Sequence, residues 1–235
     1  MFRVLMLFIC MVITAVLPST LSKAEDSTIV KLATYDLGAH WAGADQAVAD
    51  IYASLGKEVI LQPMSLVRGV RAVCTHQVGG VVIRGAALIK KHCPNVLVSD
   101  APIIYAELYP ITINSDIKVL TSSDYARYRI AIIRAAEPFV DAAYKENSFT
   151  ANSFNDGVRM LIADRVDILI GSYPDALHVY QRITNKKNIS VAGPSVYKVP
   201  LYHIVNAEEK KMFEKVNAEI NARTKTGELP LRLDF

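Results

Sequence analysis

Short runs of β-branched and aliphatic residues alternate with amphipathic stretches along most of this 235-residue chain. The run at residues 80–83 is almost wholly apolar, which is typical of a strand covered on both faces of a parallel sheet. A chain that alternates strands and helices in this way folds into parallel strands joined by right-handed crossovers. The pattern therefore predicts an α/β protein.

The sequence pattern predicts the positions of the strands and of the helices. The apolar runs predict strands or extended segments at residues 29–34, 58–61, 80–83, 95–98, 103–114, 129–133, 149–151, 166–170, 189–192 and 199–205. The amphipathic stretches predict helices at residues 44–55, 66–74, 86–91, 138–147, 154–162, 173–183 and 207–223. These elements suit either one doubly wound domain or two lobes, with extended crossings near residues 111–118 and 194–202.

The N-terminal segment has the pattern of a secretory signal peptide. Arg3 precedes an apolar run at residues 5–17, and small residues, Ser22 and Ala24, stand at the positions that a signal peptidase reads. The alternative is an uncleaved anchor helix, but the run is shorter than the roughly 20 apolar residues that span a bilayer. We therefore expect residues 1–24 to be removed and the rest of the chain to be exported.

The charge of the chain argues against binding to nucleic acid. The 26 basic and 23 acidic residues give a formal net charge of +3. Two of the bases, Arg3 and Lys23, lie in the expected signal peptide, so the remainder has 24 basic and 23 acidic residues, a net charge of +1. A chain so nearly neutral has no overall basic field to attract a phosphate backbone.

Three cysteines are present, and Cys10 lies in the expected signal peptide. Cys74 and Cys93 then form either one disulfide or two buried free thiols, and the sequence favours neither. A disulfide here would add about 3 kcal/mol by constraining the unfolded chain. A zinc site that also used His76 and His92 is disfavoured, because adjacent ligands such as His92 and Cys93 rarely point at one ion.

Five segments resemble, in order, the motifs of one protein family. They are residues 78–84, 94–103, 128–134, 164–170 and 211–231, with Asp164 where the family has glycine. Together they resemble the type II periplasmic solute-binding fold, family 3, which includes the amino-acid receptors of ABC importers. The stretch 84–95 is also similar to a divergent proteobacterial branch of that family.

The resemblance implies a two-lobed α/β fold with two crossing strands at the hinge. Lobe 1 would comprise residues 25–113 with 198–235 returning to it, and lobe 2 residues 114–197. A monomeric periplasmic protein of this kind would reversibly capture a small polar or anionic solute in the cleft between its lobes. It would present that solute to a membrane permease or a sensor, without a cofactor or a metal.

Three candidate binding residues fall in lobe 1 near strand ends. Tyr35 and Trp41 follow the first strand, where an aromatic side chain stacks on the ligand in many relatives; the alternative for Trp41 is a half-buried place in a surface loop. Arg84 follows the strand at residues 80–83, where its guanidinium suits a carboxylate or phosphate. The alternative for Arg84 is a structural salt bridge.

Lobe 2 contributes Arg134 and Ser172 to the expected site. The family often has hydroxyl residues where this chain has Ala135 and Ala136, and Arg134 adds a charge there or is a solvated surface base. Ser172 stands where amino-acid receptors usually place the aspartate that binds the ligand ammonium, and Asp175 is expected to cap the next helix. The resemblance therefore disfavours a standard α-amino acid as the ligand.

Two other functions are kept beside solute binding. One is an exported enzyme on the same fold, such as a cyclic-acid dehydratase, which needs a carboxylate base from Asp36, Asp100 or Glu137. Asp100 is also a candidate ligand-binding residue. The other is an interaction protein that has lost its cleft chemistry. The sequence has no nucleophile elbow, phosphate loop or metalloprotease motif, so we expect no enzyme activity.

Overall fold

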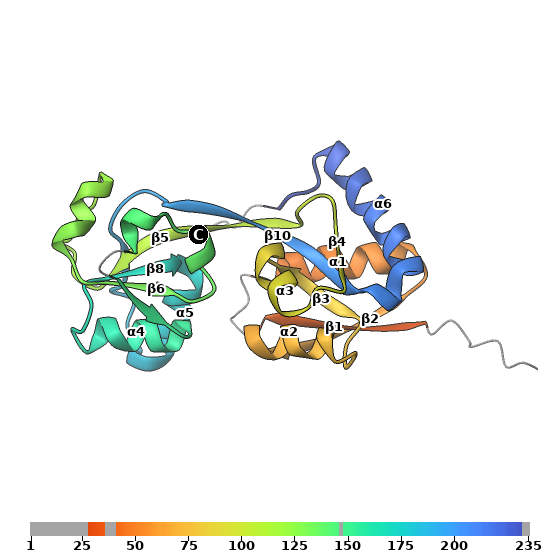
Figure 1. Ribbon diagram of the computed structural model, residues 1–235, viewed down its shortest axis with the longest axis horizontal. Coiled ribbons are helices and arrows are strands. Elements are labelled where there is room, and N and C mark those ends of the chain that lie inside the picture. Colours follow the sequence, from red (N-terminus) through yellow and green to blue (C-terminus); the bar gives the residue numbers. More distant parts are fainter. Residues whose placement is uncertain (1–27, 36–40, 146–147, 232–235) are drawn as a thin grey trace, which may run out of the picture.

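The computed structural model describes residues 28–35, 41–145 and 148–231, and the expected signal peptide lies outside these ranges. The described chain forms two lobes that lie side by side and are joined by two long strands, β5 and β10 (Figure 1). This is the two-lobed α/β architecture that the family resemblance implied. No helix within the described ranges is both long and apolar enough to cross a membrane.

The elements follow the predicted alternation. The strands are β1 (Ile29–Tyr35), β2 (Glu58–Met64), β3 (Gly80–Arg84), β4 (Val96–Val98), β5 (Ile104–Thr112), β6 (Ile130–Ile133), β7 (Ser148–Ala151), β8 (Ile168–Ser172), β9 (Ser190–Val191) and β10 (Tyr197–Asn206). The α-helices are α1 (Ala42–Ser54), α2 (Leu66–Cys74), α3 (Ala86–His92), α4 (Phe154–Ile162), α5 (Tyr173–Thr184) and α6 (Lys210–Thr226).

The parallel pairing predicted from the sequence is found inside each lobe. In lobe 1, β1 pairs in parallel with β2 and β3, and in lobe 2, β6 pairs in parallel with β7 and β8. The full strand order is β2-β1-β3-β10-β5-β8-β6-β7. The crossing strands are the exception, because β10 runs antiparallel to β3, β4 and β5. The short strand β4 therefore lies outside the parallel part of the sheet.

Both crossing strands run between the lobes, and β10 pairs with strands of both (Figure 1). The first half of β10 pairs with residues 104–108 of β5, and its second half pairs with β3 and β4. From Leu108 onward β5 pairs with β8. The first crossing therefore lies earlier than the expected residues 111–118, because β5 has already joined the sheet of lobe 2 there.

One predicted helix is wrong. Residues 138–147 were expected to form a single helix, but the chain makes two short 3₁₀ turns, Glu137–Phe139 and Ala142–Tyr144. Between them Val140 has extended backbone angles and is buried. Burial of this side chain in the core of lobe 2 outweighs the local helix preference of the segment.

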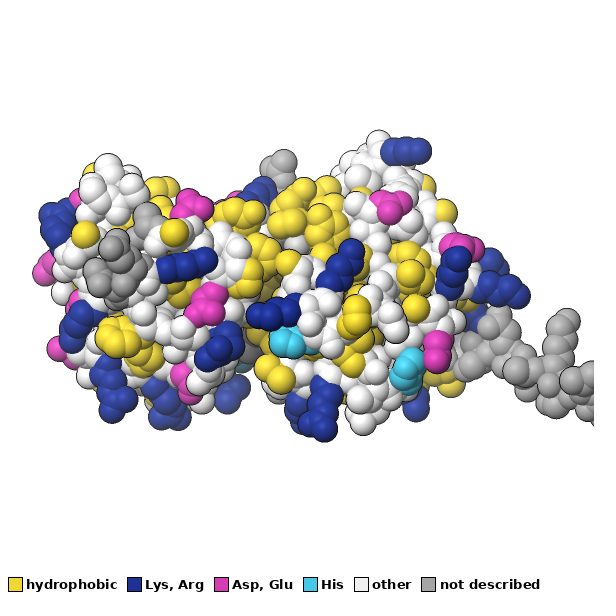
Figure 2. Space-filling model, viewed as in Figure 1, with side chains coloured by type: hydrophobic (Ala, Val, Ile, Leu, Met, Phe, Trp, Pro, Cys, Tyr) yellow, Lys and Arg dark blue, Asp and Glu magenta, His cyan; other side chains and the backbone are white. Residues whose placement is uncertain are grey.

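The strands that lead to the cleft are the most buried parts of the sheet. All five residues of β3 and all five of β8 are buried. Ser153 caps helix α4, since its Oγ accepts a hydrogen bond from the backbone N–H of Asp156. In the space-filling view, hydrophobic side chains gather where the two lobes meet (Figure 2).

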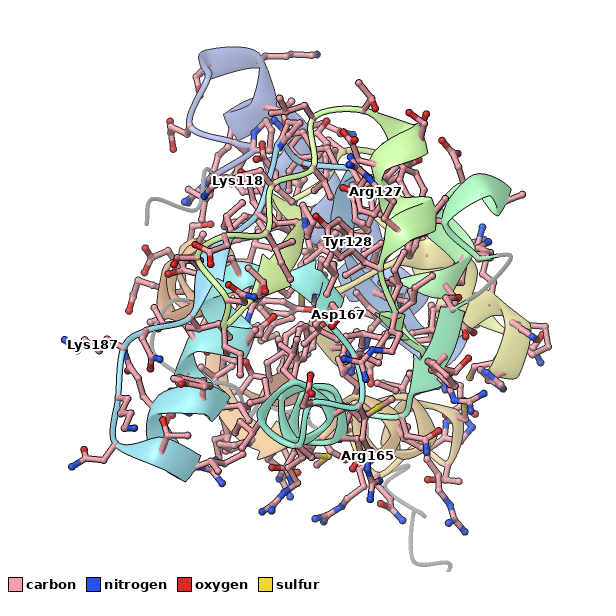
Figure 3. The ribbon with its side chains drawn as sticks, turned by 90° about the vertical axis from the view of Figure 1, so that its left-hand side faces the viewer. Lys118, Arg127, Tyr128, Arg165, Asp167 and Lys187 are labelled. Atoms are coloured by element: carbon pink, nitrogen blue, oxygen red, sulfur yellow. The ribbon has the colours of Figure 1, made fainter. Side chains whose placement is uncertain are left out.

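The far end of lobe 2 is polar and solvated. Lys118, Arg127, Arg165 and Lys187 are exposed there (Figure 3). Asp167, before β8, accepts hydrogen bonds from the guanidinium of Arg129, with Nη2 2.7 Å from Oδ1. This exposed ion pair belongs to the surface. None of the residues named in this paragraph lines the cavity between the lobes.

Candidate functional site

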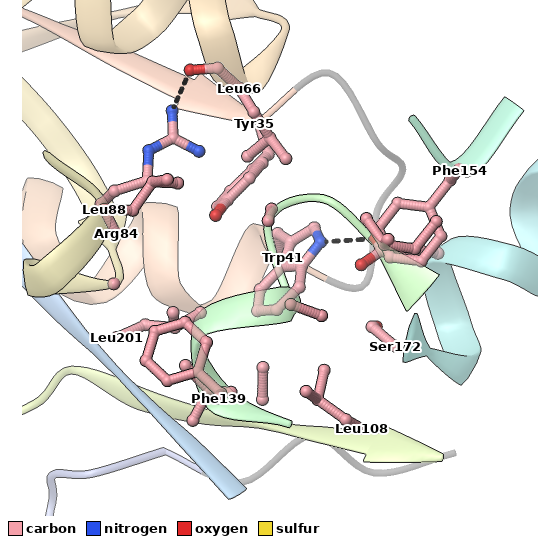
Figure 4. Close-up of a pocket in the computed structure, with 17 residues that line it drawn as sticks. Tyr35, Trp41, Leu66, Arg84, Leu88, Leu108, Phe139, Phe154, Ser172 and Leu201 are labelled. Carbon is pink, nitrogen blue, oxygen red and sulfur yellow. Dashed lines mark hydrogen bonds between the residues drawn. The ribbon is translucent and has the colours of Figure 1, made fainter. Parts of the chain in front are cut away.

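A small cavity lies between the two lobes and has a volume of about 70 Å³. Its walls come from both lobes and from the crossing strands (Figure 4). Lobe 1 contributes Tyr35, Trp41, Leu66, Arg84, Gly85 and Leu88; lobe 2 contributes Ile133, Ala135, Ala136, Phe139, Phe154, Ser172 and Asp175; and the crossing strands contribute Ala106, Leu108, Val199 and Leu201. The structure thus brings together four of the six predicted binding residues.

The ends of two buried strands position the polar groups of this cavity. Strand β3 ends at Arg84 and is followed by α3, and strand β8 ends at Ser172 and is followed by α5. In α/β sheets, the carboxyl ends of parallel strands are where ligands bind. Two such ends, one from each lobe, therefore face each other across the cleft.

Arg84 is a buried cation with most of its donors unused. Its side chain is 3% exposed, and Nη2 donates a hydrogen bond to the carbonyl oxygen of Leu66 at 3.1 Å. Nε and Nη1 have no hydrogen-bond partner. Arg84 has no carboxylate partner among the described residues, so the alternative of a structural salt bridge does not apply to it. The guanidinium carbon lies 4.6 Å from the centroid of the Tyr35 ring.

Tyr35 and Trp41 form an aromatic stack beside Arg84. Their ring centroids are 5.3 Å apart and the planes are inclined by 24°. Burial raises the pKa of the Tyr35 hydroxyl, and the nearby Arg84 cation only partly offsets this rise. Trp41 is 3% exposed, so its alternative place in a half-buried surface loop is wrong. Both aromatic rings line the cavity, and their contact with a ligand stays a prediction.

Trp41 also reaches the opposite lobe. Its Nε1 donates a hydrogen bond to Oδ1 of Asp175, 2.9 Å away. Asp175 is 3% exposed and belongs to the first turn of α5, where the sequence predicted only a helix cap. Its carboxylate instead takes part in a bond between the lobes. This role was missed because Trp41 and Asp175 are far apart in the sequence.

Ser172 is the second unsatisfied polar group of the cavity. Its side chain is 4% exposed, and the hydroxyl has no hydrogen-bond partner. Buried hydroxyls are normally hydrogen-bonded, because burial without a partner costs free energy. A group that enters the cavity can therefore pair with Ser172 as well as with Arg84.

Asp100 and Arg134 are not brought to the cavity. Oδ2 of Asp100 accepts hydrogen bonds from the side-chain amides of Asn217 and Asn221 on α6, and these bonds lower the pKa of the carboxyl. Asp100 thus attaches the turn after β4 to α6. Arg134 is exposed and donates from Nε to Asn152. The position of Arg134 therefore fits a solvated surface base better than a residue that binds a ligand in the cavity.

The candidate catalytic carboxylates are not gathered in the cleft either. Glu137 accepts a hydrogen bond from the Thr150 hydroxyl and does not line the cavity. Asp36 lies outside the described residues. No group of three or more His, Cys, Asp or Glu side chains suited to a metal occurs among the residues that the structure describes.

Gly69 lies against Arg84 and was not recognised from the sequence as part of its surroundings. It lies inside α2, and a Cβ atom at this position would come within 2.9 Å of Arg84 Nη2. The absence of a side chain leaves room for the guanidinium against the helix. A glycine in the middle of an amphipathic helix costs stability relative to alanine, and this is the signal that could have drawn attention to it.

Cys74 and Cys93 are free thiols in the structure, so the disulfide alternative is not realised there. Cys93 is buried, and burial raises its pKa to about 11, with a further rise from the neighbouring Cys74 thiol. Neither cysteine lines the cavity. Their environment is therefore that of two packed side chains.

Comparison by sequence finds nothing: no family model and no curated protein matches the chain. Solved structures do match. An ancestral arginine-binding protein bound to glutamine is 16% identical, with a TM-score of 0.65, over 86% of this chain and 94% of that one. The substrate-binding protein of an amino acid ABC transporter is 17% identical, with a TM-score of 0.62, over 85% of this chain and 95% of that one.

A domain of a Bordetella pertussis protein gives a third match. The VFT2 domain of Bordetella pertussis BvgS is 13% identical, with a TM-score of 0.64, over 83% of this chain and 87% of that domain. Identities this low reveal a shared fold and not a shared ligand. The chain therefore has the two-lobed α/β fold of periplasmic binding proteins.

Proposed function

We propose that this protein is an exported solute-binding protein that reversibly captures a small anionic solute in the cavity between its lobes. The observation that carries the proposal is Arg84, a buried cation whose Nε and Nη1 have no partner inside that cavity. Burying a charge without a counter-charge costs several kcal/mol. An anion bound at Arg84 would offset that cost, so the cavity is better suited to an anion than to a neutral solute.

The proposal includes export to the periplasm after removal of residues 1–24. The similar structures include an amino acid ABC transporter's binding protein and a BvgS periplasmic domain, so either a permease or a sensor fits as the membrane partner. Lobe 1 is taken as residues 25–113 with 198–235, and lobe 2 as residues 114–197. The protein would act as a monomer and without a cofactor.

The hydrogen bond that Asp175 accepts from Trp41 favours binding over catalysis as the function of the cavity. Asp175 is the one acidic side chain among the described residues that line the cavity, and it accepts a hydrogen bond from Trp41. A general base must reach the proton that it removes from the substrate. Asp175 instead lies within a contact that holds the two lobes together.

The test is a binding measurement on the protein purified after expression of the whole chain. We expect a panel of small carboxylates to include ligands that raise the melting temperature, since a ligand at 100 times its Kd adds about 2.7 kcal/mol of stability. Arg84→Gln should weaken a hit at least tenfold. Arg71→Gln is the matched control, because Arg71 is exposed on α2 of the same lobe. An unchanged affinity in Arg84→Gln contradicts the proposal.

A further inference from the structure

We infer that the captured solute is a small monocarboxylate with a hydrocarbon body and without an ammonium group. This inference rests on the proposed function and narrows it to one class of ligand. It follows from the number and the position of the charges in the cavity, from the apolar character of the remaining walls, and from the small volume of about 70 Å³.

The cavity offers one positive charge. Arg84 is the one basic side chain among the described residues that line it, and three of its N–H donors, on Nε and Nη1, are unpaired. A planar guanidinium matches the geometry of a carboxylate. Ser172 adds a neutral hydroxyl from the other lobe and does not change the charge balance. One negative charge on the solute can thus pair with Arg84, whereas the second negative charge of a dianion would find no cation in the cavity.

The position of Asp175, the carboxylate of the cavity, does not allow it to bind the ammonium group of an α-amino acid whose carboxylate is bound to Arg84. Arg84 lies against one side of the Tyr35 ring, Tyr35 stacks on Trp41, and Trp41 is hydrogen-bonded to Asp175 (Figure 4). The cation and the carboxylate therefore lie at opposite ends of a row that contains two aromatic rings. An α-amino acid carries its carboxylate and ammonium groups on the same carbon, so it cannot reach both residues at once.

The remaining walls are hydrocarbon. Leu88, Leu108, Ile133, Phe139, Phe154 and Leu201 surround the polar groups. Each methylene group that moves from water into such an environment strengthens binding by about fourfold. A solute that is apolar beyond its carboxylate gains from these contacts, whereas a polyhydroxylated or second charged group would lose its hydration without finding enough partners.

The lobes approach each other closely around this space, which limits the length of the solute. A Cβ atom on Gly85 of lobe 1 would come within 3.1 Å of Phe139 Cζ of lobe 2. The backbone of Gly85 has φ −66°, which any residue can adopt, so it is the approach of Phe139 that favours glycine here. We therefore expect short-chain acids, represented by pentanoate and 3-methylbutanoate, to fit better than long-chain ones.

The experiment is isothermal titration calorimetry of the purified protein with matched ligands. Pentanoate and 3-methylbutanoate are the test ligands. The other ligands each differ from the test acids in one respect. Pentanamide lacks the negative charge, and inorganic phosphate lacks the hydrocarbon chain. Valine and leucine carry an added α-ammonium group, 5-aminopentanoate carries a distant ammonium group, and glutarate carries a second carboxylate. We expect the two test acids to bind, and every other compound to bind at least tenfold more weakly. This comparison needs no variant and so does not depend on how Arg84 substitutions fold.

The outcomes separate this inference from the proposed function. Tighter binding of an amino acid, 5-aminopentanoate, glutarate or phosphate overturns the inference and leaves a solute-binding protein. Binding of pentanamide as tight as that of pentanoate overturns both, because the anion site would then be unused. Absence of binding by every compound here and by the wider carboxylate panel also overturns both. A tenfold loss of pentanoate affinity in Arg84→Gln, without loss in Arg71→Gln, supports the inference.

Discussion

The indole Nε1 of Trp41 donates a hydrogen bond to Oδ1 of Asp175 at 2.9 Å, and this bond joins residues that are 134 positions apart. Trp41 precedes α1 in lobe 1, and Asp175 lies in the first turn of α5 in lobe 2. The bond therefore connects the two lobes directly across the cavity. Any opening of the cleft by a hinge motion has to break it.

Removing this contact should favour an open protein. In Asp175→Leu the acceptor is lost, whereas Asp175→Asn keeps an oxygen that the indole can bind. We expect Asp175→Leu to lower the free energy of unfolding by about 2 kcal/mol, as for a buried bond to a charged group, and to increase the radius of gyration in small-angle X-ray scattering. Asp175→Asn should stay close to the wild type in both measurements.

A double-mutant cycle checks that the effect comes from the bond itself. Trp41→Phe keeps an aromatic ring against Tyr35 and removes the N–H donor. If the bond holds the lobes together, the effects of Trp41→Phe and Asp175→Leu on unfolding should be clearly less than additive. Additive effects and unchanged scattering curves would show that the contact does not control closure.

The substitution Gly69→Ala should separate binding from stability. Alanine favours the helix by up to about 1 kcal/mol, but its Cβ would come within 2.9 Å of Arg84 Nη2 and displace the guanidinium. We expect ligand affinity to fall about tenfold, equivalent to one charge-assisted hydrogen bond, with the free energy of unfolding unchanged or raised. Calorimetry and urea unfolding measure the two quantities.

Gly43→Ala is the matched control for this prediction. Gly43 lies in α1 of the same lobe, and a Cβ there would meet Leu231 Cδ1 at an ordinary distance of 3.8 Å. It should raise stability without changing affinity. Equal affinities in the wild type and in both variants would mean that the position of the guanidinium against α2 does not matter for binding.

The buried imidazole of His203 should make stability depend on pH. His203 is fully buried in β10; Nδ1 lies 3.2 Å from the carbonyl oxygen of Val82, and Nε2 lies 3.0 Å from the Tyr52 hydroxyl. A neutral ring with its hydrogen on Nδ1 donates to Val82 and accepts from Tyr52. Burial lowers the pKa of His203 to about 4 from its ordinary 6.5, and the backbone contacts only partly oppose this.

The unfolded chain therefore binds a proton on His203 between pH 6.5 and 4 while the folded chain does not. The contribution of the neutral ring is complete above pH 6.5 and is lost as the pH falls toward 4, by about 3 kcal/mol in total. Urea unfolding at pH 7.5, 5.5 and 4.5 measures this decline. His203→Gln should reduce the pH dependence in that window. An equally steep decline in the variant would assign it to other groups.

Cys93 should react slowly with thiol reagents in the folded protein. Burial is the largest cause of its raised pKa and persists when Cys74 is replaced, so the thiolate, which is the reactive form, stays scarce at pH 8. In a Cys74→Ser variant kept reduced, we expect Ellman's reagent to label Cys93 at least tenfold faster in urea than in buffer. Rapid labelling in buffer would mean that the thiol is exposed and ionised.

The local pattern of the sequence was sufficient for most elements and for part of the site. Strands β3 and β8 could be recognised because they are apolar on both faces. The residues at their ends, Arg84 and Ser172, were assigned to a cleft through the family resemblance, which places the ligand at the carboxyl ends of strands. Asp100, another candidate binding residue, is held away from the cavity, since β4 pairs antiparallel with β10 and the turn after β4 lies against α6.

Burial periodicity and the residues at the ends of the buried strands were therefore determined by the sequence alone, because they depend on neighbours within a few positions. The Trp41–Asp175 bond, the space that Gly69 leaves for Arg84, and the extended backbone of Val140 were decided by the tertiary structure. Each of these depends on groups that meet only when distant segments pack. Packing and the burial of charge, which set such contacts, are not encoded in any short stretch of residues.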